Sequence, residues 1–147
     1  MAPRVSEPLY TRDILRLASA IPHLGLLDAP DGTADIRSPT CGSRVVVTVK
    51  LDGQGRVVAL GQKVSACAFG QASAALMAAH AIGKSKQELS GALKAIENWL
   101  RHRVQASLLA PPWPGLETLE PARLRTGRHG AILLPFRALL AAIEDAS

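Results

Sequence analysis

The chain has 147 residues, 48% of them hydrophobic and only 3% aromatic, and it carries a formal net charge of +5. This length suits a single domain, 1–147, whose core is built from Ala, Leu, Val and Ile. So few rings argue against a binder of single-stranded nucleic acid, which stacks bases on aromatic side chains.

Arginines concentrate toward the C-terminal part, at Arg101, Arg103, Arg123, Arg125, Arg128 and Arg137. A solvated basic face is the simplest explanation, and it is favoured over a nucleic-acid surface because charge alone is weak evidence. An acidic protein partner stays open. No stretch approaches the ~18 apolar residues of a membrane span, and two cysteines in such a chain are expected to be reduced. We therefore expect a cytoplasmic protein.

The first predicted helix covers residues 8–20, with Thr11 as a possible N-cap. A turn-rich stretch at 25–32 ends this region. A short edge strand is expected at 33–37.

A β-hairpin is predicted next. The valine-rich stretch 44–51 and the stretch 56–65 both have strand character and flank the turn Asp52-Gly53-Gln54-Gly55. A run of small residues then predicts a helix over 67–82 that lies tightly on the sheet.

The C-terminal part is predicted to be helical. Ser85 and Glu88 form a possible capping box for a helix that runs to about Arg103. Residues 117–128 are ambiguous, and a closing helix is expected over 131–144, with Pro135 tolerated in its first turn or two. The predicted fold is therefore α+β, a three-stranded antiparallel sheet packed against several helices.

Two cysteines lie at the ends of predicted elements. Cys41 is in the turn before the strand 44–51, and Cys67 opens the small-residue helix. Because a hairpin returns the chain to its starting end, both should lie near one end of the sheet. A helix N-terminus also favours a thiolate at Cys67. The pair is either a set of metal ligands or two small residues in a scaffold whose site has decayed.

Four short motifs carry a family resemblance: Leu9-Tyr10, Pro39-Thr40-Cys41-Gly42, Lys50-Leu51-Asp52-Gly53, and Cys67 followed by Ala72-Ser73. In these motifs the chain resembles the U-type iron–sulfur cluster assembly scaffolds, which include IscU, SufU and the N-terminal domain of NifU. The resemblance implies a SufE/NifU-like fold and a non-enzymatic role. It also implies exchange of iron, zinc or a cluster with a cysteine desulfurase or cluster-transfer proteins.

The resemblance also implies a ligand set, from which this chain departs. Such scaffolds normally hold a [2Fe-2S] cluster or zinc with three cysteines and an aspartate. Cys41 and Cys67 match the first two cysteines, Ser43 stands in place of the aspartate, and Gly130 stands in place of the third cysteine, beside His129. The third cysteine resembles the sulfur acceptor of the family, so its absence weighs against de novo cluster building.

The remaining donors leave a [2Fe-2S] cluster or zinc open as the bound group. A [2Fe-2S] centre needs four protein ligands, whereas zinc bound by Cys41, Cys67, His129 and water has acceptable ligand types. Alternatively, His129 caps a helix or meets solvent. A homodimer that supplies ligands from both subunits would also complete the set.

Two functions follow as alternatives. The chain is either an atypical scaffold that transiently binds iron, zinc or a cluster, or a degenerate homologue that acts as a non-catalytic interaction or regulatory protein without a cofactor. Zinc-dependent hydrolysis is weakly supported, because no general base is evident near the two cysteines.

Overall fold

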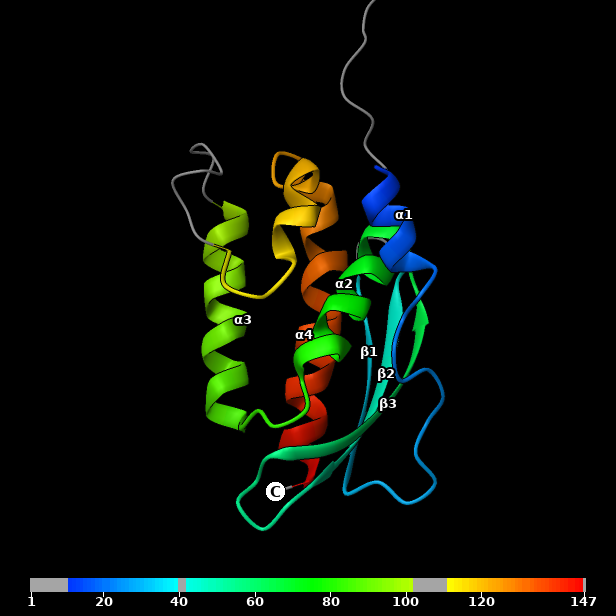
Figure 1. Cartoon of the computed structure of the whole chain (residues 1–147), viewed down its shortest axis with the longest axis vertical. Coiled ribbons are helices and arrows are strands. Elements are labelled where there is room, and N and C mark those ends of the chain that lie inside the picture. Colours follow the sequence, from blue (N-terminus) through cyan, green and yellow to red (C-terminus); the bar gives the residue numbers. More distant parts are fainter. Residues whose placement is uncertain (1–10, 40–41, 102–110, 147) are drawn as a thin grey trace, which may run out of the picture.

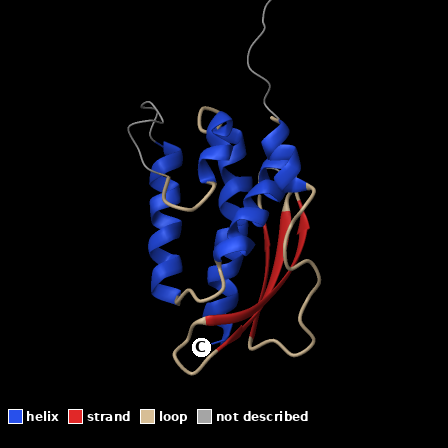
Figure 2. Ribbon diagram, in the orientation of Figure 1, coloured by secondary structure: helices blue, strands red, loops and turns tan. Residues whose placement is uncertain are grey.

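The computed structural model in Figure 1 describes residues 11–39, 42–101 and 111–146. Within them, one three-stranded antiparallel sheet has the order β1-β2-β3, and helices pack on one of its faces (Figure 2). The strands are β1 (Gly32–Arg37), β2 (Arg44–Leu51) and β3 (Val57–Ser65). The α+β class is confirmed, and the strand bounds agree with the prediction to within one residue.

The β2–β3 hairpin forms because its turn is hydrogen-bonded by one side chain. Asp52 Oδ1 accepts hydrogen bonds from the backbone N–H groups of Gln54 and Arg56, both at 2.9 Å. The strands then pair so that Arg44 lies opposite Ser65. The start of β2 and the end of β3 therefore lie at the same end of the sheet.

Five helical elements within the described residues accompany the sheet. They are α1 (Arg12–Ala18), α2 (Ala68–His80), α3 (Lys86–Arg101), the 3₁₀ helix η2 (Leu116–Ala122) and α4 (Thr126–Ala146). Both predicted caps are confirmed. Thr11 Oγ1 accepts the N–H of Ile14 at 3.2 Å, and Ser85 and Glu88 exchange hydrogen bonds of 2.9 and 3.1 Å.

Two features of the C-terminal part differ from the prediction. The ambiguous stretch 117–128 contains most of η2 and the beginning of α4, which starts at Thr126 instead of residue 131. Pro135 therefore lies in the interior of α4, and its predicted place in the first two turns is wrong. Because proline has no N–H, Pro135 cannot donate to the carbonyl of Ala131.

The helix that covers most of the sheet is α4, which packs against β1 and β2 (Figure 1). The inward-facing side chains of β2, Val45, Val47 and Val49, are completely buried. The small-residue helix α2 contacts β3, where Gln62 Nε2 donates to the carbonyl of Ala74 at 3.3 Å. Its small residues allow a close approach to α1 and α4 instead of to the sheet, so the predicted tight packing on the sheet is wrong.

No helix in the described ranges combines the length and the apolar character that crossing a bilayer would need.

Candidate functional site

Several elements begin or end at one end of the molecule, the upper end in Figure 1. There β1 ends at Arg37, opposite Arg44 at the start of β2, and the N–H of Ser38 donates to the carbonyl of Ser43 at 2.8 Å. The helices α2 and α4 also begin there (Figure 1). We call this region the thiol end, because Cys67 precedes α2 directly.

Cys67 is the N-cap residue of α2. Its backbone is extended (φ −67°, ψ 172°), its carbonyl accepts the N–H of Gln71 at 2.9 Å, and its side chain makes no capping hydrogen bond. The thiol is free and half-buried. Cys67 therefore stands at the helix end where the N–H groups of the first turn have no partner within the helix. Cys41, the predicted partner, lies outside the described residues.

The beginning of α4 packs directly against the beginning of α2. A Cβ atom on Gly70 would lie 3.4 Å from the carbonyl oxygen of Ala131, and Ser73 Oγ donates to the carbonyl of Ile132 at 2.5 Å. Gly130, which the resemblance predicts to stand in place of the family's third cysteine, immediately precedes this contact. The fold thus brings the segment of Gly130 against the helix that Cys67 caps.

His129 makes a hydrogen bond that fixes the role of each ring nitrogen. Its Nε2 lies 2.8 Å from the carbonyl oxygen of Arg123. A carbonyl can only accept, so this contact assigns the proton to Nε2. In the neutral ring, Nδ1 is then the one nitrogen with a lone pair for a metal ion.

Arg123 belongs in the sequence to the arginine-rich C-terminal part that suggests a solvated face, but its side chain is only 2% exposed. Its Nε donates to the carbonyl of Trp99 at 3.1 Å, Nη1 donates to both carboxylate oxygens of Glu120 at 3.0 and 3.1 Å, and the guanidinium lies 4.6 Å from the Trp99 ring centroid. The i, i+3 spacing of Glu120 and Arg123 is the only signal in the sequence for this arrangement.

The remaining predicted position, Ser43, is 4% exposed. Across residues 11–39, 42–101 and 111–146, no three His, Cys, Asp or Glu side chains gather closely enough to hold a metal ion. Neither Cys67 nor His129 therefore belongs to such a group within that part of the chain. The ligand set of Cys41, Cys67 and His129 stays a prediction.

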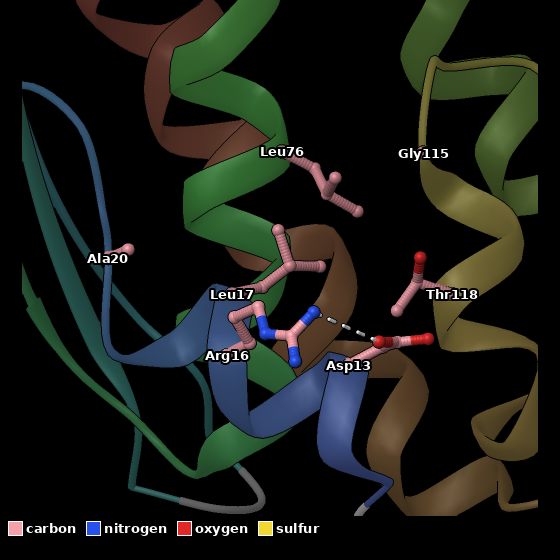
Figure 3. A pocket seen from close by; sticks show the side chains of 7 residues that line it. All are labelled: Asp13, Arg16, Leu17, Ala20, Leu76, Gly115 and Thr118. Carbon is pink, nitrogen blue, oxygen red and sulfur yellow. Dashed lines mark ion pairs between the residues drawn. The ribbon is translucent and has the colours of Figure 1, made fainter.

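A separate cleft of about 350 Å³ lies between α1, α2 and the start of η2 (Figure 3). Leu17 and Leu76 point into it, and Asp13 and Arg16 form a 3.9 Å ion pair at its rim. The residues that line it are Asp13, Arg16, Leu17, Ala20, Leu76, Gly115 and Thr118. Neither Cys67 nor His129 is among them, so the cleft is distinct from the candidate site.

Comparison with known proteins places this chain in a family. Residues 9–109 match the NifU-like N terminal domain. The chain belongs to this family.

Solved structures agree with this assignment. A nitrogen-fixing NifU-like protein (N-terminal) from Brucella abortus is 33% identical, with a TM-score of 0.84 and 94% of each chain covered. A proposed iron–sulfur cluster assembly scaffold protein for the SUF system from Fervidobacterium islandicum is 24% identical, with a TM-score of 0.76, 92% of this chain and 96% of that chain covered. At that identity the second likeness supports the fold alone. No curated protein matches the chain.

Proposed function

We propose that this protein is an atypical iron–sulfur cluster assembly scaffold that holds iron, zinc or a cluster transiently and passes it to partner proteins. The observation that carries the proposal is Cys67, the N-cap residue of α2, whose thiol makes no capping hydrogen bond. The segment that follows Gly130 packs against the first turn of the same helix. Membership of the NifU-like family supports the same role. The role is binding and transfer, with no catalytic step.

The donors that we assign to the cargo are Cys41, Cys67 and His129. Two thiolates and an imidazole suit zinc or iron, and the hydrogen bond to Arg123 directs ligation by His129 to Nδ1. Gly130 supplies no donor. A four-ligand cluster site is therefore incomplete within one chain, and this incompleteness favours loose, exchangeable binding over tight storage.

A second copy of the chain would supply the missing cluster ligands. In a homodimer, each subunit would contribute its thiolates to one shared cluster, which needs four protein ligands in all. The partners that we propose for loading and transfer are a cysteine desulfurase and cluster-transfer proteins. Both partners are inferred from the scaffold role, so the proposal of these partners fails if that role is wrong.

Anaerobic addition of iron and sulfide tests the proposal. The wild type should develop visible absorption with iron bound, and Cys41→Ala and Cys67→Ala should each lose most of it. His80→Ala is the matched control, because His80 is exposed at the C-terminal end of α2, far along the helix from Cys67. If neither a cysteine-dependent chromophore nor bound metal appears, the scaffold proposal is wrong.

Ser43 and Gly130, at two of the family's ligand positions, favour one alternative: a degenerate scaffold that acts as a non-catalytic interaction or regulatory protein without a cofactor. Elemental analysis of the purified protein separates the two functions. Stoichiometric metal counts against the alternative. Metal-free protein that forms a stable complex with a purified partner supports it.

A further inference from the structure

We propose that the thiol end is a docking surface for an acidic protein, recognised by four arginines that form no ion pair among the described residues. We call Arg12, Arg37, Arg125 and Arg128 the arginine rim. The inference deepens the proposed function, on which it rests, by naming the chemistry of the partner surface that meets Cys67. It does not depend on whether metal is bound.

The fold places the arginine rim around the candidate site. Arg12 is the first residue of α1, and Arg37 is the last residue of β1. Arg125 directly precedes α4, and the N–H of Arg128 in its first turn donates to the carbonyl of Arg125 at 2.8 Å. These four element ends all lie at the upper end of Figure 1, where α2 begins.

Three carboxylates near this end are paired with arginines outside the rim. Asp35 is paired with Arg44 at 2.6 Å, and Glu120 is paired with Arg123 at 3.0 Å. Asp13 lies 3.9 Å from Arg16. In the described ranges, none of these three carboxylates pairs with a rim arginine. Arg37 is close enough to Asp35 to help lower the pKa of that carboxyl, so the charge of Arg37 is partly compensated. Arg12, Arg125 and Arg128 form no ion pair within that part of the chain.

At the opposite end of the molecule, two aspartates accept backbone N–H groups. Asp31 accepts the N–H of Leu51 at 2.8 Å, and Asp145 accepts the N–H of Thr33 at 2.9 Å. These carboxylates hold the ends of β1 and β2 in place, so they serve the fold. The rim arginines place positive charge at the end where Cys67 lies, which would orient an approaching anionic surface toward it.

A protein partner fits this surface better than a nucleic acid. The Phe and Trp side chains within the described ranges are all buried, at 0–3% exposure: Phe69, Trp99, Trp113 and Phe136. That part of the chain offers no exposed Phe or Trp ring on which a base could stack. Guanidinium groups pair well with carboxylates through two parallel hydrogen bonds. Glu and Asp side chains are therefore the expected counterparts.

The probe is an octaglutamate peptide, titrated into the metal-free full chain and followed by backbone amide NMR shifts. We expect the shifts to map to the arginine rim. Arg125→Glu combined with Arg128→Glu should weaken binding about tenfold or more. Lys50→Glu combined with Lys94→Glu changes the net charge equally at exposed positions away from the rim and should change affinity by less than about twofold.

Three outcomes would overturn the inference: equal weakening by both charge-reversed pairs, shifts that map elsewhere, or tighter binding of an oligothymidine strand of the same charge, which would indicate a nucleic acid. Cys67→Ser should bind the peptide as well as the wild type does. Loss of the metal-binding function and loss of the docking surface can therefore be told apart.

Discussion

Arg123 links three elements at the thiol end: its side chain reaches the end of α3 and Glu120 of η2, and its carbonyl holds His129 of α4. Arg123→Met keeps the apolar stem but leaves the carbonyl of Trp99 and the carboxylate of Glu120 without their donor. We expect the free energy of unfolding to fall by about 2–4 kcal/mol.

Urea unfolding measures this loss, with Arg125→Met as the control because Arg125 is exposed and outside any ion pair in the described ranges. The control should change stability by less than about 0.5 kcal/mol. Equal stability of the two variants would show that the buried guanidinium contributes nothing.

Gly130 is the residue at which the site could be completed. Gly130→Cys adds a thiol at the predicted position of the family's third cysteine, beside the contact of α4 with Gly70, so we expect a reconstituted cluster to resist a chelator for longer than in the wild type. Gly127→Cys is the matched control, since Gly127 lies in the same helix and a Cβ atom added there would meet nothing within 4 Å. Equal retention in both variants would mean that Gly130 does not face the cargo.

At the scale of elements, replacing either of two glycines with alanine should change stability, in opposite directions for the two positions. Gly91 lies within α3 with open space around it, so Gly91→Ala should stabilise the protein by about 0.5–1 kcal/mol. Gly61 lies in β3, where a Cβ atom would come within 2.3 Å of the carbonyl oxygen of Gly25. Gly61→Ala should therefore destabilise by about 1–3 kcal/mol. Thermal unfolding measures both, and a stabilising Gly61→Ala would contradict the observed path of residues 23–27 over the sheet.

The start of α3 should make stability depend on pH. In the folded protein the pKa of Glu88 lies below its ordinary value, because its carboxylate accepts the N–H of Ser85 and pairs with Arg56. A lowered folded pKa means that this contribution is present above the ordinary carboxyl pKa of about 4.3 and is lost as the pH falls through the folded value.

Glu88→Gln should therefore lower stability at about pH 7 and flatten the loss of stability toward about pH 3. Urea unfolding at the two pH values measures this difference. Glu117→Gln is the control, because Glu117 is exposed and outside any ion pair in the described ranges. In this variant the free energy of unfolding should change between the two pH values as it does in the wild type. If Glu88→Gln also shows that change, the capping carboxylate is not the source of the dependence.

At the scale of the whole molecule, local signals predicted most of the fold. The valines of residues 44–51, the Asp52 turn and the caps at Thr11 and Ser85 each act through neighbouring residues, and each is present in the structure. The capping pattern could be predicted because both of its partners lie within three residues of one another.

The parts that were not predicted depend on distant or backbone partners. The early start of α4 was hidden by Gly127, Gly130 and Pro135, all poor helix formers whose cost is offset by packing against α2 and the sheet. His129 bonds a backbone carbonyl, and Arg123 is buried by residues of α3, so neither contact leaves a pattern in the sequence. Sequence resemblance supplied the candidate donors, but it could not supply their geometry.

The central claim is that Cys41 and Cys67 bind one metal ion together. Cobalt(II) titration tests it most directly, because the thiolate-to-cobalt charge-transfer band grows with the number of coordinated thiolates. We predict a one-to-one complex whose band falls to about half in Cys41→Ala and in Cys67→Ala, and vanishes in the double variant. A band that is absent from the wild type, or unchanged in either single variant, would contradict the claim.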